Sequence, residues 1–389
     1  MKLDPTQVAA VDHAVSHRFS IITGGAGTGK TTIIKEMVAR LAKEKKPVHL
    51  CAFAGKAAAR LKEATGRETS TIHRLLGYNG VKFTNPTLAG STVIVDEASM
   101  VDSELMAAII MRKPDRLILV GDEAQLPPVG KGQPFHDIII EAPNMVYNLT
   151  KCFRNREAVF KAATAIRNGE SLMNFDQSPG ERWCIAETGD AKQTHEYILK
   201  LVEDDAFDFD QDIILCPKNG DSEAAPCTVK SLNEDIAEIV NPRDPDDGSI
   251  KVGDRVINTK NVAEKDIWNG TTGTVQAIGQ KGDMHIELDV PTDENESTVH
   301  LTRDEAKNLK LAYALTVHKS QGSQYRRVMF VALGRDQHAL LTRSLIYTAV
   351  TRTREMCAVV GEHRAFQRGR MKVTSKRTVI QELSKQEVA

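Results

Sequence analysis

The chain has 389 residues, enough for roughly two to three domains, and 41% of them are hydrophobic, which suffices for packed cores. Its formal net charge of -1 excludes an overall basic field, so any nucleic-acid binding must use local patches. The six cysteines form no C-x-x-C pair and have no histidine at zinc spacing, which excludes a disulfide framework and a zinc finger. The N-terminus lacks an apolar signal core, and no run of about eighteen apolar residues occurs. We therefore expect a soluble, cytoplasmic protein without membrane contact.

Residues 3 to 17 form the first predicted element, an amphipathic helix that opens on a cap and a first-turn proline, Asp4 and Pro5. Gln7 lies on this helix. Taken alone, it is expected to be a solvated side chain. Its position ahead of a glycine-rich loop also makes it a candidate nucleotide contact.

That loop follows an apolar strand over 19–23 and precedes a helix over 31–43. It has the G-x-x-x-x-G-K-[ST] spacing of a phosphate-binding loop, in which backbone N–H groups and a helix N-terminus face the phosphate. Its lysine reaches the β/γ-phosphates, and the next hydroxyl ligates Mg²⁺. A glycine-rich turn with a chance lysine is the alternative. The candidate nucleotide contacts are Gln7, Gly24, Gly25, Ala26, Gly27, Thr28, Gly29, Lys30, Thr31 and Thr32, with Lys30 also catalytic and Thr31 a metal ligand.

A second strand over 48–53, a tight loop and an alanine-rich helix complete a βαβ unit. Phe53 and Lys56 lie at the carboxyl end of this strand, the ligand-binding edge of a parallel sheet, although Lys56 is equally compatible with a surface lysine. His73, on a short capped helix over 69–76, is also compatible with an ordinary packed histidine. The Gly-, Asn- and Pro-rich segment 77–91 has the length of a hairpin or a loop.

Two further buried strands end in polar side chains. The run 92–95 leads to the adjacent carboxylates Asp96 and Glu97, and the run 116–120 leads to Gln125, which two prolines hold at the strand edge. Beside a phosphate loop, the aspartate completes the Mg²⁺ shell, the next acid deprotonates the attacking water, and the glutamine senses the γ-phosphate. Solvent-facing turn carboxylates are the alternative. We predict a complete nucleotide-binding domain over residues 1–150.

The second half is predicted to be another α/β domain. Its expected helices are near 155–168, 190–203 and 228–240, and its expected strand is 213–216. The segments 204–212 and 241–248 are expected to be acidic loops. Short strands with glycine turns then predict a small β barrel at about 271–305. The α/β core resumes at 311–317. The basic stretch 364–377 is expected to be mainly a solvated or mobile tail, with DNA contact as the lesser alternative.

Five segments in this order resemble the helicase motifs of superfamily 1: residues 24–31, 95–98, 121–127, 316–322 and 349–354. Together they are similar to the RecD-like and phage Dda-like branch, the 5′ to 3′ DNA helicases, and they span nearly the whole chain. The resemblance implies an α/β fold of two RecA-like parallel-sheet (P-loop NTPase) domains, 1–150 and 151–389. It places a short pin insertion at about 77–91 in the first domain and an SH3-like β barrel at about 271–305 in the second.

The same resemblance implies an ATP-dependent DNA helicase with Mg²⁺ and ATP bound between the two domains. Arg154, from spacing alone an ordinary basic residue, and Arg352 would act as arginine fingers, and Gln324 would lie near the ribose. Phe53, Lys56, His73, Thr316 and His318 would contact single-stranded DNA, through the backbone or by stacking. The implied partners are single-stranded DNA and duplex junctions, with replication or recombination proteins as candidates, for a monomer in a bacterial or phage-infected cell.

Two other functions stay open: a motor subunit of a larger recombination or nuclease assembly, and a small-molecule phosphotransferase. A chain that begins almost at Gln7, without the extra N-terminal domain of some RecD-like proteins, favours a small stand-alone or phage-type enzyme. The segment 77–91 is short for a pin, and Tyr78 and Phe83 are its only aromatic residues. We therefore expect translocation to be stronger than strand separation.

Overall fold

The computed structural model describes residues 3–85, 87–153, 157–170, 172, 182–220, 226–244, 250–265, 267–291, 297–334, 337 and 339–373. These residues divide into two compact units, one up to Phe153 and one from Glu157 to Val373. Among the described helices, none is long and apolar enough to span a bilayer.

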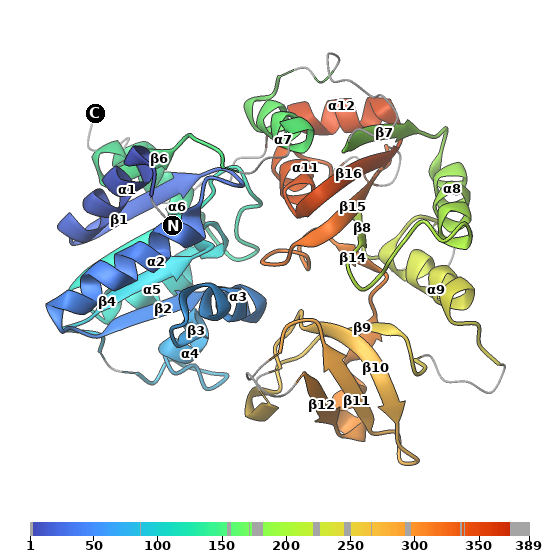
Figure 1. The fold of residues 1–389 in the computed structure, drawn as a ribbon, viewed down its shortest axis with the longest axis horizontal. Coiled ribbons are helices and arrows are strands. Elements are labelled where there is room, and N and C mark those ends of the chain that lie inside the picture. The colour runs from blue at the N-terminus through green and yellow to red at the C-terminus, as the bar shows by residue number, and fades with distance from the viewer. Residues whose placement is uncertain are drawn as a thin grey trace. The chain divides into compact units, whose positions relative to one another are not determined.

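A parallel sheet forms the centre of the first unit (Figure 1). Its strand order is β3-β2-β4-β5-β1-β6, and every neighbouring pair is parallel. The strands are β1 (Phe19–Gly24), β2 (Val48–Ala52), β3 (Thr69–Thr71), β4 (Thr92–Asp96), β5 (Arg116–Gly121) and β6 (Val146–Leu149). The helices are α1 (Pro5–Ser16), α2 (Lys30–Leu41), α3 (Gly55–Thr65), α4 (Ile72–Leu75), α5 (Ser103–Met111) and α6 (Pro134–Glu141). The predicted alternation of strands and helices is confirmed.

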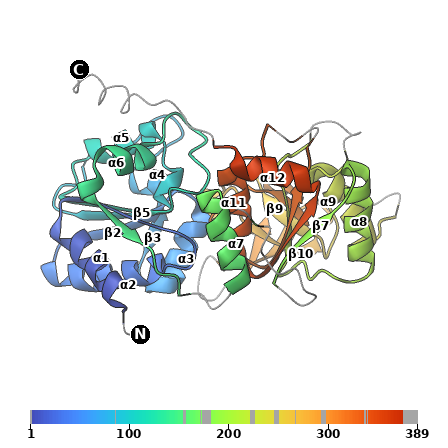
Figure 2. The ribbon, with the colours of Figure 1, turned by 90° about the horizontal axis from the view of Figure 1, so that it is seen from above.

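Helices cover both faces of this sheet. Successive strand residues point to opposite faces, so Ile21 and Val93 pack on the α5 and α6 side, whereas Ile22 and Ile94 pack on the α1 and α2 side. Figure 2 shows the two helical layers on opposite sides of the strands. Because both faces are buried, the strands are unbroken apolar runs, which is why they could be predicted from the sequence.

The second unit contains a parallel sheet of order β14-β8-β15-β16-β7. Its strands are β7 (Trp183–Glu187), β8 (Ile213–Cys216), β14 (Ala314–Thr316), β15 (Tyr325–Ala332) and β16 (Thr353–Gly361). Its helices are α7 (Glu157–Asn168), α8 (Ala191–Glu203), α9 (Val229–Val240), α11 (Arg343–Val350) and α12 (His363–Met371). Helices α8 and α9 share a core with one face of the sheet. On the opposite face, the ring of Trp183 lies 6.4 Å from that of Phe366 in α12.

The second unit also carries an antiparallel sheet of order β12-β11-β10-β9-β13. It comprises β9 (Arg255–Asn258), β10 (Thr272–Ile278), β11 (Met284–Leu288), β12 (Thr298–Leu301) and β13 (Leu309–Leu311), with the short helix α10 (Arg303–Ala306). This sheet extends on both sides of the range 271–305 expected for an inserted barrel, because β9 and β13 pair with each other. Leu311, predicted to begin the return to the α/β core, is the last residue of β13.

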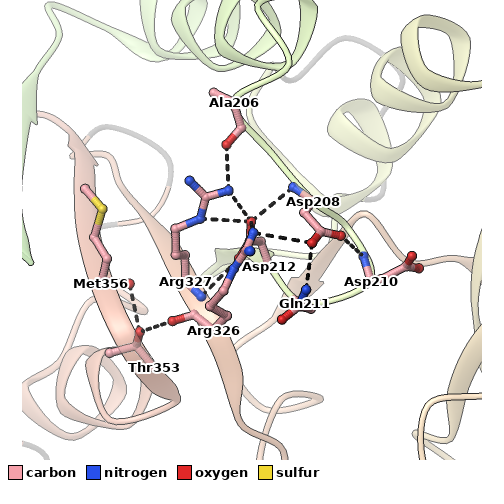
Figure 3. A network of polar contacts seen from close by, with 9 residues as sticks. All are labelled: Ala206, Asp208, Asp210, Gln211, Asp212, Arg326, Arg327, Thr353 and Met356. Carbon is pink, nitrogen blue, oxygen red and sulfur yellow. Dashed lines mark hydrogen bonds and ion pairs between the residues drawn. The ribbon is translucent and has the colours of Figure 1, made fainter.

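A buried carboxylate joins the starts of β8 and β15 (Figure 3). The side chain of Asp212 is fully buried and accepts hydrogen bonds from Arg326 Nε at 3.0 Å and from Arg327 Nε at 2.9 Å. The backbone N–H of Asp208 also donates to it. The acidic loop 204–212 therefore ends in an organised ion-pair network.

A second buried carboxylate joins the two sheets of this unit. Asp254, just before β9, accepts hydrogen bonds from the hydroxyl of Tyr313, just before β14, at 3.0 Å and from Arg243 at 2.9 Å. The side chain of Asp254 has no exposed surface. The antiparallel sheet is thus anchored to the strand that carries Thr316.

The basic stretch 364–377 is not mainly a tail. Residues up to Met371 belong to α12, and Arg370 is 9% exposed, with its guanidinium donating to the carbonyls of Gly169 and Glu170. The expectation was wrong because basic composition does not reveal that one arginine is buried. Residues 374–377 lie outside the described part of the chain.

Candidate nucleotide-binding site

The glycine-rich loop runs from the end of β1 to the start of α2. Gly27 and Gly29 have φ angles of 80° and 83°, in the left-handed region that favours glycine. A Cβ atom on Gly24 would lie 2.8 Å from Cβ of Leu149 in β6. The glycines are therefore needed both for the curl of the loop and for its close approach to the neighbouring strand.

Lys30 closes this loop from its C-terminal end. Its Nζ donates to the carbonyl oxygens of Gly24 at 2.7 Å and Gly25 at 3.1 Å. The Thr28 hydroxyl donates to the same Gly25 carbonyl at 2.9 Å. The ammonium is thus held inside the curl of the loop, where a phosphate group would meet it.

Gln7 is part of this site, and its interpretation as a solvated side chain was wrong. It is 4% exposed, and its Nε2 donates to the carbonyl of Thr28 at 3.4 Å. Its Oε1 accepts from the backbone N–H of Asp4, which completes the cap of α1. Gln7 was among the candidate nucleotide contacts, but its hydrogen bond with Thr28 was not predicted because it joins segments that are distant along the chain.

Two adjacent carboxylates lie at the end of β4: Asp96 is its last residue and Glu97 follows it. Glu97 has a φ of 51°, a strained conformation for a non-glycine residue, and its Oε2 is buried without a hydrogen-bond partner among the described residues. Burial, together with the charge of Glu97, raises the pKa of Asp96 to about 6, and the nearby Lys30 acts in the opposite direction. The carboxylates of Asp96 and Glu97 repel each other, and one Glu97 oxygen lacks a hydrogen bond among the described residues. Carboxylate oxygens of this kind are suitable ligands for a hard divalent cation. The residues therefore fit Mg²⁺, with the Thr31 hydroxyl at the start of α2 as a further oxygen donor.

Strand β5 places the motif of residues 121–127 beside the phosphate loop. Thr23 pairs with Gly121 in the sheet, and its hydroxyl donates to the carboxylate of Glu123. Gln125 is 6% exposed, and its backbone N–H donates to the Asp122 carbonyl at 3.2 Å. Glu123 was not predicted as a site residue. Glu123 lies in the same motif, residues 121–127, as Gln125, and this position could have identified it as a site residue.

The DNA-contact candidates of the first unit form an aromatic cluster. The rings of Phe53 and His73 lie 6.2 Å apart, and His73 lies 5.4 Å from Tyr78. Tyr78 forms an antiparallel bridge with Phe83, so the segment 77–91 contains a hairpin. Tyr78 and Val81 are 45% and 87% exposed. Lys56 is the second residue of α3 and lies beyond the same end of β2 as Phe53.

The candidates of the second unit lie on two adjoining segments. Thr316 ends β14, His318 is exposed on the loop that follows, and Gln324 immediately precedes β15. Arg352 is 4% exposed and donates to the carbonyls of Thr348 at 3.1 Å and Ser323 at 3.4 Å. Arg352 therefore lies next to the segment that ends in Gln324. Arg154 lies outside the described residues.

A parallel sheet in which β1 leads into such a loop, with a carboxylate pair at the carboxyl end of β4, one strand further along the sheet beyond β5, defines a P-loop nucleotide-binding protein. The family described as "AAA domain" matches residues 2–181, and that described as "UvrD-like helicase C-terminal domain" matches residues 311–360. The chain is 35% identical over 377 residues to the ATP-dependent RecD2 DNA helicase of Deinococcus radiodurans, covering 94% of this chain and 50% of that protein. It is 31% identical over 403 residues to the RecBCD enzyme subunit RecD of Mycolicibacterium smegmatis, covering 91% of this chain and 70% of that protein.

The chain belongs to the RecD-like family of superfamily 1 helicases. It spans about half the length of the Deinococcus relative. Among solved structures, this chain is similar to a Pif1 helicase in a structure of two coordinating Pif1 helicases at forked double-stranded DNA. The TM-score is 0.60 at 19% identity, and the match covers 100% of this chain and 97% of that chain. Candida albicans Pif1 matches with a TM-score of 0.56 at 19% identity, covering 100% and 99%. At this identity the likeness defines the fold alone, that of RecA-like parallel-sheet domains.

Proposed function

We propose that this chain is an ATP-dependent DNA helicase that translocates 5′ to 3′ on single-stranded DNA and separates duplex DNA. The observation that carries the proposal is the Lys30 ammonium inside the phosphate loop, close to the partly buried Asp96 and Glu97 carboxylates. Membership in the RecD-like family supports DNA as the substrate and the direction of movement.

Each residue of this site would have a separate task. Lys30 would hold the β/γ-phosphates, and Thr31 and Asp96 would hold Mg²⁺, which neutralises phosphate charge when bound. The buried oxygen of Glu97, which has no hydrogen-bond partner in the described part of the chain, is suited to orient the attacking water and accept its proton. Gln125 would sense the γ-phosphate. Gln7 would support the loop through Thr28.

The arginines and the second unit complete the proposal. We infer that Arg154 and Arg352 stabilise charge on the transferring phosphoryl group, and that Gln324 contacts the ribose. Preorganised guanidinium groups are effective in this role because their charge needs no rearrangement during the reaction. The present hydrogen bonds of Arg352 with two backbone carbonyls would then be exchanged for phosphate contacts.

DNA would be held by Phe53, Lys56, His73, Thr316 and His318. An aromatic ring can contact any base face, which suits sequence-independent movement. We propose that the hairpin in 77–91 is a short pin and that the antiparallel sheet of residues 255–311 is an SH3-like barrel. The corresponding domains would be residues 1–150 and 151–389.

A second function, as the motor subunit of a larger assembly, is favoured by one observation. The Mycolicibacterium relative is named as a subunit of the RecBCD enzyme. In that case the chain would hydrolyse ATP on DNA, and strand separation would need a partner protein.

The deciding experiment measures unwinding of two matched partial duplexes, one with a 5′ tail and one with a 3′ tail, alongside DNA-stimulated ATP hydrolysis. The wild type should open only the 5′-tailed duplex. Lys30→Ala should lower ATP hydrolysis by about a hundredfold or more, because a preorganised donor to the transition state is lost. Lys35→Ala, an exposed residue of the same helix, is the control and should behave as wild type.

The other outcomes are also informative. Unwinding that survives Lys30→Ala would exclude the proposed motor, and opening of only the 3′-tailed duplex would exclude the polarity. Stimulated hydrolysis with neither duplex opened would favour the motor-subunit function.

A further inference from the structure

The antiparallel sheet presents two histidines side by side on its solvent face. His285 of β11 is directly opposite His300 of β12 in the strand register, and their ring centroids are 4.8 Å apart. Asp283 immediately precedes β11, and its carboxylate meets the histidines on this face of the sheet. Both histidines are exposed and Asp283 is partly buried.

These three side chains bring their ligand atoms together. One nitrogen of each histidine and one oxygen of the aspartate all lie within 4.8 Å of one another, and His300 Nε2 is 3.1 Å from Asp283 Oδ2. Atoms bound to one tetrahedral zinc ion are about 3.4 Å apart, because each bond is about 2.1 Å long. Small rotations of the side chains would suffice to close the site.

The scaffold beneath the cluster is suited to hold it. On the reverse face of the same strands, Ile286 and Leu301 are buried in the core of the sheet. Gly279 leaves room for the aspartate, because a Cβ atom there would lie 2.3 Å from Asp283 Oδ1. The backbone N–H of Gly279 donates to the Asp283 carbonyl at 2.8 Å, which closes the hairpin. Sites on strands are more precise than sites on loops.

We propose that Asp283, His285 and His300 bind a divalent transition-metal ion, with Zn²⁺ as the representative. Two imidazoles and one carboxylate are ligands that suit zinc, nickel and copper, whereas Mg²⁺ prefers oxygen ligands alone. Three protein ligands leave one position open to solvent. The ion would clamp β11 to β12, and this site is separate from the proposed Mg²⁺ site of the first unit.

The test is calorimetric titration of the intact protein with Zn²⁺, with Mg²⁺ in excess throughout. His285→Ala and His300→Ala should each weaken the zinc site by about tenfold or more, since loss of even an outer partner of a metal ligand has an effect of that size. Zinc should raise the melting temperature of the wild type more than that of either variant, because an ion that binds only the folded state stabilises it. Bound Co²⁺ should give visible absorption in the wild type that is lost in His285→Ala and His300→Ala.

A second histidine pair supplies the matched control. His13 lies on α1 and His17 is the extended residue just after that helix, with ring centroids 4.5 Å apart. The double variant His13→Ala/His17→Ala should keep the full-affinity site. Metal-free melting of the His285 and His300 variants should match the wild type, which separates loss of metal from loss of folding. Equal zinc affinity in all variants, or no zinc binding by the wild type, would overturn the proposal and leave an ordinary ion pair between His300 and Asp283.

Discussion

The carboxylate of Asp212 accepts hydrogen bonds from two guanidinium groups, so its negative charge contributes to the stability of the fold. Burial tends to raise its pKa, but hydrogen bonds from Arg326 and Arg327 outweigh burial and lower the pKa below its ordinary value. A carboxyl group whose folded-state pKa is depressed contributes stability above its unfolded pKa, about 4, and loses it as the pH falls through the folded value. The network should therefore stabilise the second unit at neutral pH and weaken in acid.

Asp212→Asn should lower the free energy of unfolding at neutral pH by about 2 to 4 kcal/mol, because it removes the buried anion of Arg327 and leaves Arg326 paired with the more distant Asp208. The difference from the wild type should shrink in acid, as the pH falls below about 4 towards the lowered pKa of Asp212. Urea denaturation at both pH values measures this. Asp210→Asn is the control, since that carboxylate is 76% exposed and should matter little. An equal effect of both variants would contradict the assigned role of the network.

At the scale of elements, Asn233 of α9 completes the hydrogen bonding of an edge strand. Its Nδ2 donates to the Ala314 carbonyl and its Oδ1 accepts from the Ala314 N–H, both at 2.9 Å. Ala314 begins β14, which ends the described sheet and carries Thr316. One side chain thus replaces a neighbouring strand at this position.

Asn233→Ala should destabilise the second unit by about 2 to 4 kcal/mol, since two buried backbone groups would lose their partners. Glu234→Ala on the same helix is the control, because its side chain is 59% exposed. Urea denaturation followed by tryptophan fluorescence measures the difference. The prediction fails if Asn233→Ala is as stable as Glu234→Ala.

The elements also show what could be predicted from the sequence. The β4 run and the phosphate loop were predictable because their signals are local: an apolar run buried on both faces, and glycines at fixed spacing. Helix α1 was predictable from its cap at Asp4. The burial of Gln7, the arginine pair on Asp212 and the pairing of β9 with β13 depend on contacts between distant segments. Such contacts leave no periodic pattern in the chain.

At the scale of the whole molecule, each unit buries its own core. Both tryptophans, Trp183 and Trp268, belong to the second unit. Tryptophan fluorescence should therefore follow unfolding of the second unit, whereas far-ultraviolet circular dichroism follows both.

Ile22→Ala should lower the stability of the first unit by about 2 to 5 kcal/mol, because it opens a cavity in a core where Ile22 is fully buried. The variant should unfold earlier in urea by circular dichroism, with the fluorescence midpoint unchanged. A fluorescence midpoint that moves equally would mean that the two cores unfold as one.

The strand orders have a consequence for how the chain is made on the ribosome. The first sheet has all its described strands once Leu149 has been synthesised. In the second sheet, the only described neighbour of β7 is β16, which begins at Thr353. Trp183, fully buried in the finished protein, must therefore wait for about 170 further residues before its strand can pair, at a rate of about 5 to 20 residues per second. The first unit can fold while the ribosome is still working, whereas the second sheet must remain incomplete until β16 has been synthesised.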